Sequence, residues 1–88
     1  MTDGPPLTRD ERRVLEAIMA VKPHDVRSRT TEAVAGRAGM ATIKARRTLR
    51  GLERREPPLA VEDVDEGIGA KFWRTEYAAI EALKRSRS

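Results

Sequence analysis

The stretch VAGRAGMATIKARRTLRGLE, residues 34–53, decides the fold. Gly39 separates two segments with helical periodicity, a short one at about 31–38 and a longer one at about 41–55. A glycine at this position is typical of a helix that ends in a left-handed residue. The longer segment has one apolar side, because its apolar residues fall within roughly a quarter of the circumference at about 100° per residue. These residues are Ala41, Ala45, Leu49 and Leu52.

The opposite side of the 41–55 segment is cationic. It carries Ile43, Arg47, Arg50 and Arg54, with Lys44 and Arg46 on its flanks. Between residues 27 and 56 there are nine Lys or Arg residues and three acidic ones, a net charge of +6, whereas the whole chain carries +4. The positive charge is therefore concentrated around one helix, and a basic chain of this kind favours a polyanionic partner.

The rest of the chain supplies short elements on both sides of this helix. Thr8 and Glu11 have capping-box spacing and predict a helix at 8–22 that ends before Pro23. Val26–Arg29 is expected to be extended, and Thr30 or Thr31 can cap the 31–38 helix. After Pro57 and Pro58 the pattern changes from helical to extended and predicts strands at 59–64 and 71–74 around a glycine-containing turn, and a last helix is expected at 76–85. The domain is predicted to span 8–85, with a loose arm at 1–7 and a basic tail at 86–88.

Composition narrows the possible functions. Eighty-eight residues indicate one domain, and without cysteine the chain forms neither disulfides nor thiolate metal sites. His24 is the only histidine, and the carboxylates lack the spacing of a calcium loop, so no cofactor, no metal and no catalysis are expected. No apolar run is long enough to span a membrane, and the first six residues do not resemble a signal peptide. A cytoplasmic, nucleoid-associated protein is the expectation.

Residues 34–53 resemble the helix-turn-helix of bacterial winged-helix regulators in the MarR, IclR and GntR groups. The similarity lies in the apolar-Ala pair at 34–35, the Gly-apolar turn at 39–40 and the Leu-x-x-Leu-Glu ending at 49–53. The hairpin that closes with Trp-Arg-Thr at 73–75 resembles their wing. The resemblance implies a mainly α winged helix-turn-helix fold: a three-helix core, a two-stranded wing and a C-terminal helix. It also implies sequence-specific binding of double-stranded DNA in transcription regulation.

The resemblance assigns roles by position, with the 41–55 helix in the major groove. Residues early in the helix are expected to read bases, Arg47 by a two-pronged contact to guanine and Ile43 by contact with a thymine methyl group. The base-reading set is Thr42, Ile43, Lys44, Arg46 and Arg47. Other residues are expected to contact phosphates. The phosphate set is Thr30, Thr31, Arg50, Arg54, Lys71 and Arg74.

Other readings stay open beside this one. The wing is acidic where DNA-contacting wings carry Arg or Lys, so its tip is also a candidate surface for a protein partner. A protein–protein interaction module is one alternative, since fold does not fix function. A DNA-binding component of a plasmid or phage replication, partition or excision system is another. A homodimer through the 76–85 helix is also open. Phe72, Trp73 and Tyr77 are expected to pack in the core. The acidic wing residues are Glu62, Asp63, Asp65 and Glu66.

Overall fold

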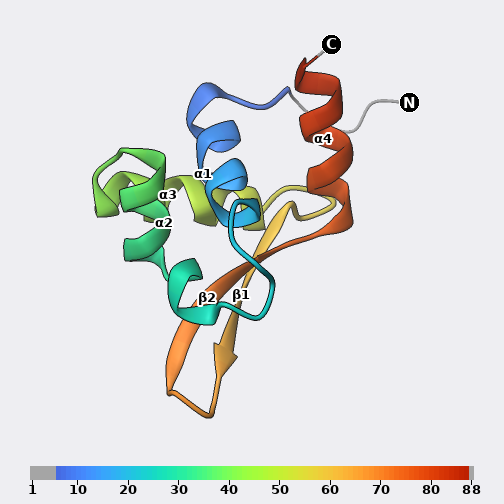
Figure 1. Cartoon of the computed structure of the whole chain (residues 1–88). Helices are drawn as coiled ribbons and strands as arrows, with labels where there is room; N and C mark the ends of the chain where they lie inside the picture. The colour runs from blue at the N-terminus through green and yellow to red at the C-terminus, as the bar shows by residue number, and fades with distance from the viewer. Residues whose placement is uncertain (1–5, 88) are drawn as a thin grey trace.

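The computed structural model describes residues 6–87, with the side chain of Arg87 left aside. Three helices form the first half, and a hairpin followed by one helix forms the second (Figure 1). The helical elements are α1 (Arg9–Met19), a 3-10 turn η1 (Val26–Arg29), α2 (Thr31–Ala38), α3 (Thr42–Glu53) and α4 (Tyr77–Arg87). The strands are β1 (Ala60–Asp65) and β2 (Ala70–Thr75). In this view the hairpin extends away from α4 at one end of the molecule.

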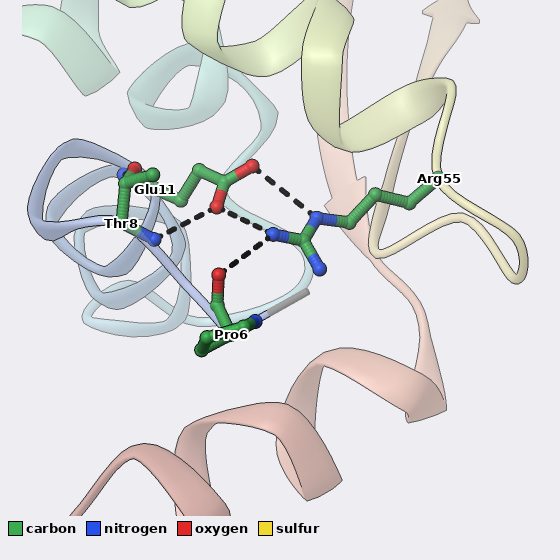
Figure 2. A network of polar contacts seen from close by, with 4 residues as sticks. All are labelled: Pro6, Thr8, Glu11 and Arg55. Carbon is green, nitrogen blue, oxygen red and sulfur yellow. Dashed lines mark hydrogen bonds and ion pairs between the residues drawn. The ribbon is translucent and has the colours of Figure 1, made fainter. Parts of the chain in front are cut away.

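The predicted capping box starts α1 and is tied to the end of α3. The Thr8 hydroxyl accepts a 3.0 Å hydrogen bond from the Glu11 amide, and the Glu11 carboxylate accepts one of 2.9 Å from the Thr8 amide. The same carboxylate pairs with Arg55, which also donates to the Pro6 carbonyl (Figure 2). Pro6 is thus held, and Leu7 packs against the core. Of the predicted arm at 1–7, residues 1–5 lie outside the described part of the chain.

The connection from α1 to α2 differs from the sequence prediction. The predicted extended piece at Val26–Arg29 is wrong, because these residues form the 3-10 turn η1. Asp25 stabilises the turn: its carboxylate accepts a 2.9 Å hydrogen bond from the Ser28 hydroxyl, and its carbonyl accepts from the Ser28 amide. The sheet among the described residues therefore has two strands, β1 and β2.

The turn between α2 and α3 has the geometry that Gly39 predicts. Gly39 adopts φ 73°, and the Met40 amide donates to the Ala35 carbonyl at 3.0 Å. This hydrogen bond and the one from the Gly39 amide to the Gly36 carbonyl satisfy the last carbonyls of α2, as in a Schellman motif. The chain can then change direction within a few residues, which places α3 against α2.

The core lies where the three helices meet the base of the hairpin. Trp73 is its largest fully buried side chain, and α4 adds Ala79, Ala82 and Leu83, a stripe at three- and four-residue spacing. The expectation that Tyr77 packs in the core is wrong, because its side chain is 74% exposed, and Ile80 on the same helix is 41% exposed. Two alanines and Leu83 thus pack α4 against the core, whereas Tyr77 and Ile80 face outward.

No helix among the described residues combines the length and the apolar character that crossing a bilayer requires.

Candidate nucleic-acid interface

Three of the four residues predicted for the apolar side of α3 are buried, so the opposite side of the helix faces outward. The prediction is wrong for Ala41, which is the N-cap of the helix and is exposed. Ala45, Leu49 and Leu52 are fully buried against the neighbouring elements. On the other side Ile43 is 72% exposed, and three arginines are also exposed. These arginines are Arg46, Arg47 and Arg54. Ile43 is an apolar side chain that is exposed among cations, on a helix whose opposite side is buried. It has no role in the packing of this chain, which makes this face a candidate contact surface.

The exposed arginines of α3 are not neutralised by the carboxylates of residues 6–87. Within residues 6–87, Arg46, Arg47 and Arg54 form neither an ion pair nor a hydrogen bond through their side chains. Lys44 differs, because its Nζ lies 3.3 Å from the Asp10 carboxylate on α1. The Lys44 side chain is 57% exposed and that of Asp10 33%, so solvent screens the pair and Lys44 can exchange Asp10 for another anion. Thr42, at the start of α3, is half-buried.

Arg50 has surroundings that do not support its predicted phosphate contact. Its Nη1 lies 3.1 Å from Glu53 and its Nη2 lies 2.9 Å from Glu62 on β1. Its guanidinium also stacks over the Trp73 ring at 5.3 Å from the centroid. The hydrogen bonds to Glu53 and then Glu62 raise the pKa of Arg50 above its usual value. The three-residue spacing to Glu53 is visible in the sequence, but the approach of Glu62 is produced by the tertiary fold.

The two threonines at the start of α2 have different environments. Thr31 is buried, and its hydroxyl accepts a 2.9 Å hydrogen bond from the indole N–H of Trp73. Its side chain is therefore occupied inside the protein, which argues against the predicted phosphate contact. Thr30 is half-buried and caps α2 by accepting from the Ala33 amide at 3.2 Å. Of the two, Thr30 is the one that lies at the surface.

The hairpin separates its charges between two faces. Side chains alternate along a strand, and the register pairs Val64 with Lys71 and Glu62 with Trp73. Lys71 therefore shares the face of Trp73, which is directed toward α2 and α3. Asp63 and Arg74 are on the other face, where they form a 3.3 Å ion pair. The carboxylate of Asp65 accepts hydrogen bonds from the amides of Gly67 and Ile68 in the turn.

The inner face of the hairpin meets α2 and α3 in a shallow groove. Arg46 and Lys71 supply positive charge to its walls, and Glu32 and Glu62 supply negative charge, of which that of Glu62 is paired with Arg50. The groove is lined by Thr30, Thr31, Glu32, Arg46, Glu62, Ala70 and Lys71. Two predicted contact residues that are 25 positions apart in sequence, Arg46 and Lys71, thus border one depression.

Several cations counted in the 27–56 segment belong to the scaffold. Arg29 is buried, its Nε has no hydrogen-bond partner among residues 6–87, and desolvation lowers its pKa, an effect that the charge of Asp25 partly opposes. Arg37 donates to the carbonyls of Ala17 and Ser28 at 3.4 and 3.1 Å. The segment's net charge therefore overstates what the outer face of α3 presents. Nothing in the sequence distinguishes these arginines from the exposed ones.

No group of three or more His, Asp or Glu side chains in the described part of the chain is placed to hold a metal ion.

A helix-turn-helix seated on a third helix, followed by a two-stranded hairpin and a further helix, is a winged helix-turn-helix fold. The structure of a mutant of S. aureus MepR, a MarR-family regulator, has the same fold as this chain, with a TM-score of 0.73 and 19% sequence identity. The match covers 92% of this chain and 56% of the MepR chain, so this chain spans little more than half of that protein. No protein-family profile matches the sequence, and no curated protein matches it.

Proposed function

We propose that this chain binds double-stranded DNA with the outer face of α3 in the major groove. The observation that carries the proposal is that Arg46, Arg47 and Arg54 project from one seated helix without partners among residues 6–87. A helix about 10–12 Å across fits a major groove about 12 Å wide. Unpaired arginines on the same helix repel each other. A polyanion bound against these arginines offsets that repulsion.

The first half of α3 holds the proposed base-reading residues. Arg47 is exposed and can donate two parallel hydrogen bonds to guanine, while Ile43 can contact a thymine methyl group. Thr42, Lys44 and Arg46 border them, and Lys44 would exchange Asp10 for a base or a phosphate. These residues lie within six positions, so they face a short run of base pairs.

The proposed phosphate contacts surround this helix. Arg54 extends them at the C-terminal end of α3, and Lys71 does so from the inner face of the hairpin across the groove from Arg46. Thr30 and the amides at the start of α2 add a site where a helix N-terminus favours an anion. Arg74 is half-exposed and would need to leave Asp63. Thr31 and Arg50 are omitted because their side chains are engaged inside the fold.

Transcription regulation is the biological role that we propose for this DNA binding. Its support is the similarity of fold to MepR, a MarR-family regulator. The alternative of a protein-interaction module was based on the acidic wing. Asp63 is paired with Arg74, and Asp65 is occupied by turn amides, so the hairpin accounts for part of that acidity itself. The observations therefore favour DNA as the partner.

A titration of the chain with a random-sequence duplex at several salt concentrations tests the proposal. DNA binding should weaken steeply with salt, with a slope in log K against log salt of about −0.9 for each phosphate contacted. The double variant Arg46→Gln/Arg47→Gln should lose most of this binding. The control Lys22→Gln/Lys84→Gln removes the same charge from the loop after α1 and from α4, and should bind almost like wild type. Equal losses in both variants would show non-specific charge attraction, and no binding at low salt would refute the proposal.

A further inference from the structure

Arg50 contacts three parts of the molecule at once. It starts from α3, reaches Glu62 on β1 and lies over the Trp73 ring on β2. The planar guanidinium can pair with two carboxylates and stack on an aromatic face at the same time, which a lysine cannot do. Arg50 is 38% exposed and Glu62 is 14% exposed in their side chains, so the contact between them is partly shielded from solvent.

The contacts of Arg50 continue to the start of α2. Glu62 and Trp73 are register partners and share the inner face of the hairpin. Trp73 is fully buried, and its indole N–H donates to Thr31 at 2.9 Å. The side chains of Arg50, Glu62, Trp73 and Thr31 therefore link α3, both strands and α2. We refer to these four residues as the wing clamp.

The outer half of the hairpin is more exposed than its base. The base is tied to α3 by a 3.1 Å hydrogen bond from the Leu59 amide to the Leu52 carbonyl, and Trp73 is in the core. Two residues further along the same face, Val64 is 50% exposed and Lys71 is exposed. A two-stranded hairpin is only marginally stable by itself, so its direction beyond the base depends on what holds this face.

We propose that Arg50 is a positioning residue that fixes the hairpin relative to α3 and so places Lys71 for a phosphate contact beside the bases that α3 reads. This inference rests on the proposed DNA binding. Arg50 does not touch DNA in this arrangement. It acts through Glu62 and Trp73, and it sets the spacing between Lys71 and Arg46 across the groove.

A first experiment needs no DNA, because Trp73 is the single tryptophan of the chain. Acrylamide quenching of its fluorescence reports how often the hairpin base opens. Arg50→Met keeps an aliphatic side chain over the ring but removes both ion pairs, and we expect roughly a twofold rise in the quenching constant, as for a local opening. The matched control Arg54→Met removes an exposed arginine from the same helix and should leave quenching unchanged.

A second experiment measures whether Lys71 depends on Arg50. In the wild type, Lys71→Ala should reduce the salt slope of duplex binding by about 0.9, the value for one phosphate contact. In the Arg50→Met background, Lys71→Ala should leave the salt slope almost unchanged, because Lys71 is no longer held at the phosphate. In the Arg54→Met background Lys71→Ala should keep its full effect. The double variant Arg50→Met/Glu62→Gln should behave like Arg50→Met. This result would show that the effect of Arg50→Met does not come from leaving the Glu62 carboxylate without a cationic partner.

The outcomes separate this inference from the proposed function. If the chain binds duplex but Lys71→Ala has its full effect without Arg50, Arg50 does not position the hairpin and the inference is overturned. Unchanged quenching in Arg50→Met overturns it as well. If the wild type binds no duplex at any salt concentration, the proposed function fails and the inference fails with it, while the quenching result still decides whether Arg50 holds the hairpin.

Discussion

The indole N–H of Trp73 donates a 2.9 Å hydrogen bond to the hydroxyl of Thr31, so the hairpin and the start of α2 are joined inside the protein. Both residues are buried, and each satisfies the polar atom of the other. The contact connects residues 42 positions apart. It gives Thr31 a structural role that its place at the start of a helix does not reveal.

Removing the Thr31 hydroxyl should destabilise the fold without a direct effect on DNA. Thr31→Val leaves the indole N–H buried without a partner, and we expect a loss of about 1–3 kcal/mol in the free energy of unfolding. Urea denaturation measures this loss. In a Trp73→Phe background the same substitution should cost much less, since the donor is gone. A Thr31→Val protein with wild-type stability and weakened duplex binding would instead make Thr31 a phosphate ligand.

Arg47 and Arg54 should contribute to DNA binding in different ways. Arg47→Ala should weaken binding to a selected site by about 1–3 kcal/mol and relax the choice at one base pair, as expected for a two-pronged base contact. Arg54→Ala should weaken selected and random duplexes about equally. Selection of bound duplexes from a random pool, followed by affinity measurements on single-base variants, checks both expectations. Identical specificity profiles for the two variants would be incompatible with these roles.

Substitution of Glu11 should lower the free energy of unfolding more than substitution of most other charged residues. Its carboxylate caps α1 and pairs with Arg55 at 2.7 Å, with both side chains 14% exposed. Glu11→Ala removes both interactions and should cost about 2–4 kcal/mol, whereas Glu11→Gln can keep the cap and should cost less. Asp10→Asn breaks the exposed pair with Lys44 and should cost below about 1 kcal/mol. Unfolding in urea ranks the three variants, and an equal cost for Asp10→Asn and Glu11→Ala would contradict the argument.

Arg29 should be replaceable by an apolar residue. It is 7% exposed, its Nε has no hydrogen-bond partner in the described part of the chain, and burial lowers its pKa. Arg29→Met keeps the aliphatic packing and removes the desolvated group, so the protein should be unchanged or more stable by up to about 1 kcal/mol. Arg27→Met, at an exposed position of the same turn, should change stability by less than about 0.5 kcal/mol. A large loss for Arg29→Met in thermal or urea unfolding would mean that the guanidinium has a stabilising role that its geometry does not show.

Two glycines three residues apart should respond oppositely to alanine. Gly36 lies within α2 with open space around its Cα, so Gly36→Ala should stabilise the protein by roughly 0.5–1 kcal/mol. Gly39 adopts φ 73°, and Gly39→Ala should cost about 1 kcal/mol or more in spite of similar open space. Thermal unfolding of both variants measures the sign of each change, and the same sign for both would contradict the conformational explanation.

Local signals in the sequence were sufficient for most of the fold. The spacing of Thr8 and Glu11 predicted the start of α1, and Gly39 predicted the turn between α2 and α3. The burial of Ala45, Leu49 and Leu52 on α3 followed from periodicity alone, because the buried positions of a helix recur at a fixed angle. Ala41 is exposed because it is the N-cap and lies before the first turn. The prediction failed at 26–29, where the Asp25–Ser28 contacts favour a turn. It also failed at Tyr77, because Ala79, Ala82 and Leu83 are the residues of α4 that face the core.

The sequence by itself determined that a cationic helix is present, since the spacing of residues on α3 fixes which side chains share a face. Only the tertiary structure decided which cations remain available. Arg50 and Arg54 lie on the same side of α3 in sequence terms, yet Arg50 is paired with Glu62 from a strand and Arg54 has no partner among residues 6–87. The physical reason is that charge pairing depends on distances of a few ångströms between segments far apart in the chain, and no local pattern encodes those distances.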